Sequence, residues 1–167
     1  NNINAIVLSK GPGSYTGLRI GTSTAKGLCY SLEIPLISIS TLEAMAYNMA
    51  IKENFELFCP MIDARRMEVF SAIYNRENIQ IRAVKADVVD EQTYKDYLTK
   101  EVLFFGDGAL KCKDIINNKN AHFLEGINPS ASNLGVLSNI KFIEKDFEDT
   151  AYFEPYYLKD FIVGKKS

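Results

Sequence analysis

The residues with the clearest capacity for chemistry lie near the start of the chain, in the stretch KGPGSYTGLRIGTSTAKGL from Lys10 to Leu28. Glycine-rich turns before a helix can cradle a phosphate, because the free N–H groups of the first helical turn attract an anion. The spacing fits neither common phosphate pattern. A Walker loop needs Lys and then Ser or Thr after Gly17, and a dinucleotide-binding turn needs its third glycine at position 16. An anion held by backbone N–H groups is therefore the less favoured interpretation, and close packing of backbones is the favoured one.

A helix capped by Ser14 and ending near Leu32, before Pro35, would arrange these residues on distinct faces. Seven residues fall in one apolar arc that we expect to face the core: Gly17, Leu18, Gly21, Thr24, Ala25, Leu28 and Leu32. A second, smaller arc contains Ile20, Gly27 and Ser31 with Ser23 at its edge, and the polar side carries Arg19, Lys26 and Tyr30. If the small residues of the first arc pack inside a lobe, leucine at position 21 should overpack it. From spacing alone, packing within the chain and contact with a partner protein are equally good interpretations of the second arc.

The other polar motifs have structural explanations that we favour. Glu43 follows Ser40 at the spacing of a capping box. Residues 63–66 (DARR) lie between two expected strands, where an aspartate stabilises a turn, and residues 106–108 (GDG) are typical of a tight turn. The functional alternatives are a polar cluster facing a cleft for residues 63–66 and a nucleotide-phosphate turn for residues 106–108.

Metal and nucleophile chemistry lacks the residue types that it requires. His122 is the single histidine, and Cys29, Cys59 and Cys112 lie far apart with no CxxC spacing. A zinc-type site therefore has too few nitrogen and sulfur ligands, and a Ser-His-acid triad would depend on His122 alone. We expect no metal, and we expect reduced thiols in a cytoplasmic protein.

Alternating strands and helices carry these motifs. Two β-α units open the chain, with strands over residues 5–9 and 35–40 and helices over residues 14–32 and 41–50, which predicts a parallel sheet. An antiparallel meander is expected over residues 57–63, 67–75 and 79–89. The remaining expected elements are a polar helix over 91–99, a strand over 102–105, a short helix over 109–117 and a longer helix over 130–145.

Composition excludes several classes of protein. The 167 residues, 47% of them hydrophobic, suffice for one buried domain or two small lobes that share a core. The net charge of −2 gives no overall attraction for nucleic acid. No apolar run approaches the roughly 20 residues that span a bilayer. The first expected strand, AIVLS, is fully apolar and early, so we expect further strands upstream of this sequence, which does not begin with Met.

Five stretches occur in order along the chain: GPGSYTGLRIGTSTAKGL, IPLISISTLEAMA, PMIDARRMEVFSAIY, FFGDGA and EPYYLKDF. Together they resemble the TsaB family, also called YeaZ, over nearly the whole chain. The resemblance implies an α/β, actin-like ATPase (RNase H-like) fold of two lobes, each a mixed sheet flanked by helices. Residues 1–39 would be the remainder of the first, partner-binding lobe, and residues 40–167 the second lobe with a carboxy-terminal tail. Family members open with a β-hairpin region that contains a D-T-S-type motif, so the resemblance implies that amino-terminal strands are missing.

The same resemblance implies a function without catalysis. TsaB-type subunits pair with the TsaD transferase, which makes threonylcarbamoyladenosine next to the tRNA anticodon. TsaD binds a metal through two histidines at i and i+4, and the analogous positions here are Thr41 and Met45, which do not replace them. The resemblance therefore implies a scaffold subunit with no catalytic residue, no cofactor and no peptidase activity. The implied partners are a TsaD-type and a TsaE-type subunit, a second copy when the chain is alone, and tRNA only through the complex, with no membrane.

In this family the pairing surface is formed largely by first-lobe helices, which favours a partner contact for the second arc and the polar side of the first helix. The predicted interface residues are Arg19, Ile20, Ser23, Lys26, Gly27, Tyr30 and Ser31. The alternative is an autonomous actin-like nucleotide-binding enzyme of the ATPase or phosphotransferase class, which would use residues 106–109 and bind ATP by itself.

Overall fold

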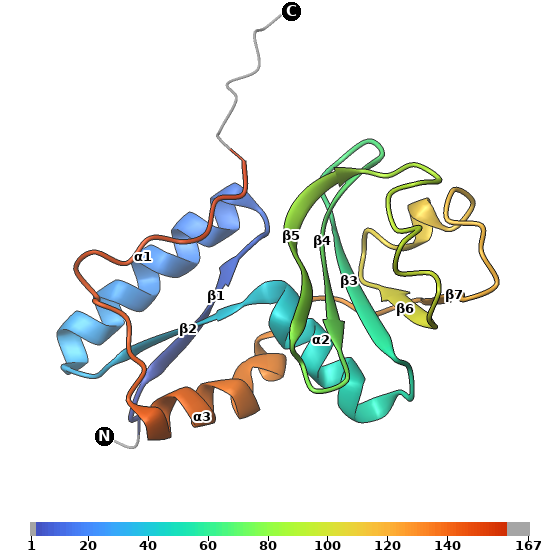
Figure 1. Ribbon diagram of the computed structural model, residues 1–167. Coiled ribbons are helices and arrows are strands. Elements are labelled where there is room, and N and C mark those ends of the chain that lie inside the picture. Colours follow the sequence, from blue (N-terminus) through green and yellow to red (C-terminus); the bar gives the residue numbers. More distant parts are fainter. Residues whose placement is uncertain (1–2, 160–167) are drawn as a thin grey trace, which may run out of the picture.

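Two β-α units build the start of the first lobe in the computed structural model, which describes residues 3–159 (Figure 1). β1 (Ile6–Gly11) leads through a turn into α1 (Tyr15–Leu32), and β2 (Leu36–Ser40) leads directly into α2 (Thr41–Lys52). The Ser14 and Ser40 hydroxyls accept hydrogen bonds from the backbone N–H groups of Gly17 and Glu43, which caps both helices. β1 and β2 pair in parallel. Both β-α units and both caps are thus confirmed.

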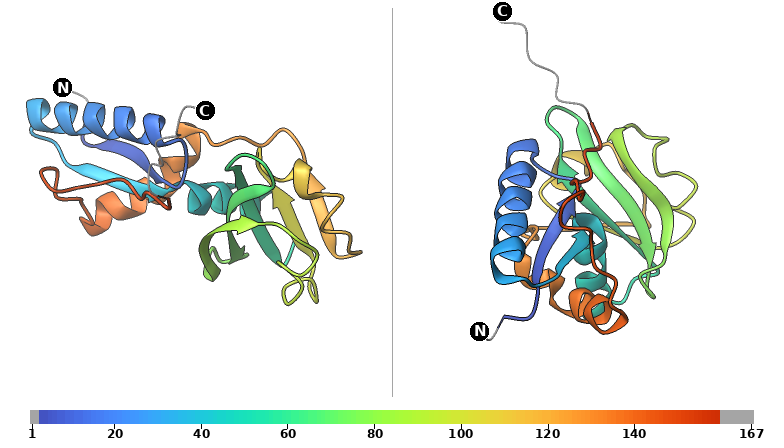
Figure 2. Two further views of the ribbon diagram at one scale, coloured as in Figure 1. Left: turned by 90° about the horizontal axis from the view of Figure 1, so that it is seen from above. Right: turned by 90° about the vertical axis from the view of Figure 1, so that its left-hand side faces the viewer.

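A five-stranded mixed sheet forms the second lobe. β3 (Leu57–Asp63), β4 (Glu68–Asn75) and β5 (Gln80–Val88) make the expected antiparallel meander. β6 (Val102–Phe105) and β7 (Ala121–Leu124) add in parallel beside β3, which gives the order β5-β4-β3-β6-β7. Seen from above in Figure 2, α2 lies between the two-stranded sheet and this larger sheet. The strand β7 was not expected from the sequence, because its four residues follow no clear alternation.

The second lobe has a core on each face of its sheet. On one face, Phe58, Leu103 and Phe105 pack against Leu42 and Met45 of α2. On the other face, strand residues pack against the segment that connects β5 to β6, and the largest buried side chains there are Phe104 and Tyr94. Neighbouring residues of β6 therefore fill opposite cores, as the pleat of a strand requires.

Two predicted helices are wrong. Residues 91–99 form successive turns, with N–H groups bonded three residues back, as from Lys95 to Gln92. Asp90 starts these turns, because its carboxylate accepts hydrogen bonds from the Gln92 N–H and the Thr93 hydroxyl. Residues 109–117 contain only a short 3-10 turn, η1 (Leu110–Cys112). The long predicted helix starts with a second 3-10 turn, η2 (Ala131–Leu134), and continues as α3 (Gly135–Glu144).

Residues 148–159, called the tail here, return to the first lobe. The Glu148 N–H donates to the Leu36 carbonyl at 2.9 Å, and the Tyr156 N–H donates to the Lys10 carbonyl at 2.6 Å. Between them, Phe153 is buried with Leu8, Ala25, Cys29 and Leu36. The expected division at residue 39 assigns the tail to the second lobe, whereas these contacts lie on β1, β2 and α1. The boundary itself stays a prediction.

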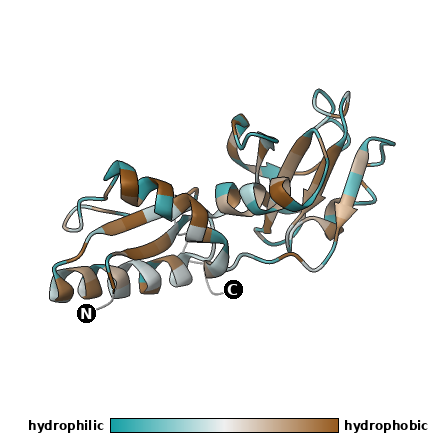
Figure 3. Cartoon of the chain, turned by 90° about the horizontal axis from the view of Figure 1, so that it is seen from below, coloured by the Kyte–Doolittle hydropathy of each residue, from teal (hydrophilic) through white to brown (hydrophobic). Residues whose placement is uncertain are grey.

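β1 is less buried than its sequence suggests. Only Leu8 and Gly11 are fully buried, because no strand among residues 3–159 pairs with the edge of β1 that faces away from β2. Figure 3 shows that β1 and β2 are nonetheless mostly hydrophobic. An apolar groove of about 510 Å³ borders this side of the lobe, lined by β1, one side of α1, the start of α2 and residues 129–134.

The buried face of α1 is rotated from the predicted one. Its buried residues are Thr22, Ala25 and Cys29, whereas Gly17 and Gly21 are exposed. A Cβ atom built on Gly21 meets no atom within 4 Å. The prediction that Gly17 and Gly21 pack inside the lobe is therefore wrong. Ala25 and Cys29 of the helix are instead buried with Leu8 of β1, Leu36 of β2 and Phe153 of the tail.

Replacing Gly21 with leucine is accordingly expected to leave stability unchanged or to raise it by up to about 1 kcal/mol, since glycine is a poor helix former. The matched control is Ala25→Leu at a buried position of the same helix, which should overpack the lobe and lower stability by roughly 1–3 kcal/mol. Thermal melting of the two variants measures both effects. A lower melting temperature for Gly21→Leu than for Ala25→Leu would contradict the observed face.

Candidate protein interface and inter-lobe cleft

The outward face of α1 carries the predicted interface residues. Ile20 is 63% exposed and Tyr30 is 85% exposed. Ser23, Gly27 and Ser31 are also exposed, and the Arg19 guanidinium lies over the Tyr15 ring at 5.5 Å. No described element covers this face, so it is a smooth surface with an isoleucine near its centre and a tyrosine at its border. Whether a partner binds there stays a prediction.

Lys26 is the exception among the predicted interface residues. Its ammonium group donates hydrogen bonds to the carbonyls of Ala151 at 2.9 Å and Phe153 at 3.2 Å. It therefore ties α1 to the tail. No local pattern predicts this contact, because the two segments are about 125 residues apart.

A second candidate site is the cleft between the lobes, a cavity of about 490 Å³. Its walls bring together the stretches that stood out in the sequence: residues 13–16, residues 63–65, Asp107 and residues 156–159. Residues 63–65 thus face a cleft, which is the arrangement that the functional interpretation of residues 63–66 as a polar cluster requires. The tail closes one side, where the Tyr157 and Tyr15 rings lie 4.9 Å apart and Lys159 forms an ion pair with Glu68 of β4.

The two carboxylates of this cleft, those of Asp63 and Asp107, accept hydrogen bonds from neighbouring groups. The Asp63 N–H donates to the Asp107 carboxylate at 2.9 Å, and the Asp63 carboxylate accepts from the Arg65 N–H at 2.9 Å. Lys111 forms an ion pair with Asp63 and donates to the Arg66 and Glu68 carbonyls. The hydrogen bond from Lys111 holds the pKa of Asp63 below its usual value. The turn-stabilising role expected for Asp63 is confirmed.

The glycines of residues 106–108 also have a structural reason. Gly106 has a φ of +107°, and a Cβ atom there would lie 2.1 Å from the Met61 carbonyl oxygen. A Cβ atom on Gly108 would lie 2.9 Å from a Val69 methyl carbon. Only glycine fits such a close approach of β6 and β3, so these residues form the tight turn that we favoured.

Two positions were compared above with the metal-binding histidines of TsaD, and both lie inside the protein. Thr41 and Met45 are both buried, and the Thr41 hydroxyl shares a hydrogen bond with Ser9. His122 lies in β7, where its ring contacts Phe55 at 4.9 Å and its Nε2 atom is 3.7 Å from Glu101. Within residues 3–159, no group of three His, Cys, Asp or Glu side chains could hold a metal ion. The three cysteines are buried free thiols.

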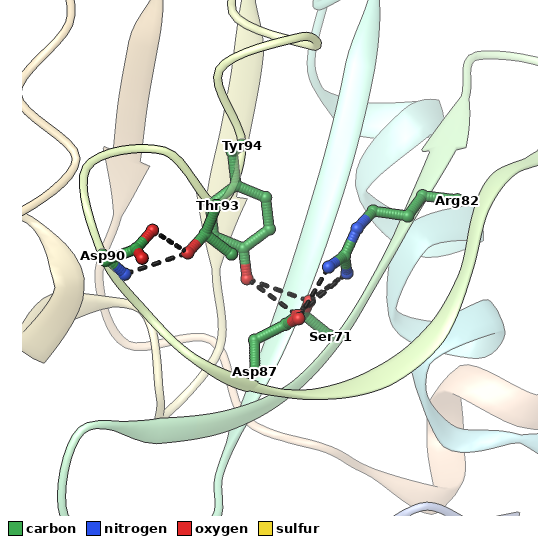
Figure 4. A network of polar contacts seen from close by, with 6 residues as sticks. All are labelled: Ser71, Arg82, Asp87, Asp90, Thr93 and Tyr94. Atoms are coloured by element: carbon green, nitrogen blue, oxygen red, sulfur yellow. Dashed lines mark hydrogen bonds and ion pairs between the residues drawn. The ribbon is translucent and has the colours of Figure 1, made fainter.

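A buried polar network that sequence reasoning missed lies in the second lobe (Figure 4). Arg82 and Asp87 form a two-pronged ion pair, with N···O distances of 2.6 and 2.8 Å. The Asp87 carboxylate also accepts hydrogen bonds from the Ser71 hydroxyl at 2.6 Å and the Tyr94 hydroxyl at 3.2 Å. Burial acts to raise the pKa of Asp87, but the hydrogen bonds from Arg82 and Ser71 outweigh it, and the pKa is lowered.

An irregularity in strand pairing explains why the sequence pattern did not predict this network. Asp87 follows Arg82 by five positions, an odd number, so a regular strand would point the two side chains to opposite faces. Between the pairs Ser71–Lys85 and Ile73–Arg82, however, β5 has one residue more than β4. This bulge brings both side chains to the same face. The network is enclosed by the core and holds the segment around Tyr94, so we assign it a structural role.

Solved structures resemble the fold along most of the chain. YeaZ from Pseudomonas aeruginosa matches with a TM-score of 0.74 at 22% identity and covers 93% of this chain and 74% of its own. In the described residues the first lobe has a parallel pair of strands rather than the expected mixed sheet, and the second lobe has a mixed sheet. With the cleft between them, these lobes define an α/β protein of the actin-like ATPase (RNase H-like) fold class.

Sequence comparisons identify the family. The family model described as TsaD, tRNA N6-adenosine threonylcarbamoyltransferase, matches residues 1–163. The tRNA threonylcarbamoyladenosine biosynthesis protein TsaB of Bacillus subtilis is 34% identical over 95% of this chain and 70% of its own length. TsaB of Escherichia coli is 30% identical over 99% of this chain and 74% of its own length. The chain belongs to the TsaB (YeaZ) family.

Proposed function

We propose that this chain is a scaffold subunit that pairs with a TsaD-type transferase in the biosynthesis of threonylcarbamoyladenosine in tRNA. The observation that carries the proposal is the match to TsaB proteins over 95% and 99% of the chain. The buried Thr41 and Met45, at positions where the transferase would need metal ligands, support a subunit that leaves the chemistry to its partner.

The outward face of α1 is the proposed pairing surface. Its large exposed side chains, Ile20 and Tyr30, stand beside glycine and serine, so a partner helix can approach closely. The first 39 residues would then belong to the partner-binding lobe. A TsaE-type ATPase and tRNA would join through the complex, because the net charge of −2 offers the chain alone little attraction for phosphates.

The proposed setting is the cytoplasm, where buried cysteines stay reduced. None of the helices within residues 3–159 has both the length and the apolar character to cross a membrane. The alternative of an autonomous nucleotide-binding enzyme is not favoured, since the chain matches TsaB proteins along most of its length.

The test combines co-purification with an activity assay. The tagged chain is expected to retain the TsaD-type subunit of the same organism, and tRNA modification by the reconstituted transferase should fall sharply when the chain is left out. Matched controls are the chain alone and the transferase alone. Full modification without the chain would contradict the scaffold role, and ATP turnover by the isolated chain would favour the enzyme alternative.

A further inference from the structure

The two most exposed large hydrophobic side chains among residues 3–159 are tyrosines. Tyr30 of α1 is 85% exposed, and Tyr152 of the tail is 83% exposed. Tyrosines are enriched at protein interfaces, because a ring and a hydroxyl are buried there at a small cost in conformational entropy. Tyr30 belongs to the pairing surface proposed above. Tyr152 has no role so far.

Lys26 connects the two tyrosines. The carbonyls that accept its hydrogen bonds, those of Ala151 and Phe153, belong to the residues on either side of Tyr152. Tyr30 follows Lys26 by four residues, so the two side chains are neighbours on one side of α1. In the right-hand view of Figure 2, α1 and the tail both border β1 and β2 on the side of the first lobe that faces the viewer.

The turn that carries Tyr152 is fixed in place. The Asp149 carboxylate accepts hydrogen bonds from the N–H groups of Ala151 at 2.9 Å and Tyr152 at 3.2 Å, and the Phe153 N–H donates to the Asp149 carbonyl at 2.8 Å. Phe153 is buried in the first-lobe core while its neighbour Tyr152 is in solvent. A side chain that is exposed on an already ordered turn loses little further entropy when a partner covers it.

We infer that the pairing surface extends from α1 onto the tail, with Tyr152 as a second aromatic contact and Lys26 as the positioning residue that holds it there. The inference rests on the proposed function, and the occupant is the transferase subunit named there. α1 carries Arg19 and Lys26 and no acidic residue, and the carbonyls of the tail take up the hydrogen bonds of Lys26. The exposed rings of Tyr30 and Tyr152 call for apolar pockets in the partner, and the positive charge of this face favours acidic groups beside them.

Affinity measurements with the purified transferase subunit test the inference. Tyr152→Ser and Tyr30→Ser should each weaken binding about 10-fold or more, which is typical of interface tyrosines. Ile143→Ser on α3, where the isoleucine is 71% exposed, is the matched control and should bind like the parent. Melting temperatures of all three should stay close to that of the parent, because exposed substitutions change stability little.

A double-variant experiment tests whether Lys26 acts on binding by positioning Tyr152. Lys26→Met keeps the aliphatic stem and removes both hydrogen bonds, and it should weaken binding in the parent while adding nothing in the Tyr152→Ser background. If Tyr152→Ser binds normally while Tyr30→Ser binds weakly, the pairing surface does not extend onto the tail. The proposed function would then remain intact. Failure of the parent to bind the transferase would overturn both.

Discussion

Replacing Asp87 with alanine is expected to lower the free energy of unfolding by about 3–5 kcal/mol, the range typical of breaking a buried ion pair from one side. The substitution leaves the Arg82 guanidinium buried without its carboxylate, and it removes a shared acceptor from Ser71 and Tyr94. Chemical denaturation monitored by circular dichroism measures the loss.

Two comparison variants make this expectation specific. The double variant Arg82→Met with Asp87→Leu should recover most of the lost stability, because Ser71 and Tyr94 can still bond to each other at 3.0 Å. Glu56→Ala breaks the exposed pair with Lys100 and should change stability by no more than about 1 kcal/mol. A loss as large in the double variant as in Asp87→Ala would show that the charge pair itself is not the cause.

The same network has a predictable dependence on pH. The pKa of Asp87 is lower in the folded protein than in the unfolded chain, where it is about 3.9. Its contribution to stability is therefore present above that value and is lost as the pH falls through the folded pKa. The double variant, which lacks this carboxylate, should lose less stability than the parent between neutral and acidic pH.

An arginine at position 20 or 27 should abolish pairing with the transferase while the chain stays folded. Both positions lie on the exposed face of α1, so Ile20→Arg and Gly27→Arg should melt close to the parent. At the centre of a helix contact, the added charge would be desolvated without a counter-ion, which we expect to cost about 2–4 kcal/mol, or roughly 30- to 1,000-fold in affinity.

Pull-down and calorimetric titration with the transferase measure this loss. Val136→Arg on the exposed face of α3 introduces the same charge away from the proposed surface and should bind normally. If Ile20→Arg binds as tightly as Val136→Arg does, the pairing surface lies elsewhere on the chain.

Local signals predicted much of the fold. The caps Ser14 and Ser40, the two apolar strands beside them and the turn at Asp63 depend on residues close in sequence, and all are found where expected. The prediction of a polar helix over residues 91–99 was wrong, because hydrogen bonds to the Asp90 carboxylate start a series of turns instead.

Long-range contacts explain the remaining differences. The face that α1 buries depends on Phe153, and the position of Lys26 depends on carbonyls of the tail, neither of which any local pattern reveals. The network around Asp87 depends on a bulge in β5, which can be recognised only from the pairing of β5 with β4. On the outward face of α1, six of the seven predicted residues are exposed and Lys26 is held by the tail. The binding of a partner there stays a prediction.

The return of the tail to the first lobe sets an order of events during protein synthesis. β1, α1, β2 and α2 leave the ribosome before the tail, so the core between β1, β2 and α1 is incomplete until Phe153 arrives about 100 residues later. At bacterial and eukaryotic translation rates this delay is roughly 5–20 seconds. The nascent first lobe must wait with apolar strands uncovered, so a chaperone would be needed there. A message truncated before the codon for Phe153 would leave this core unfinished.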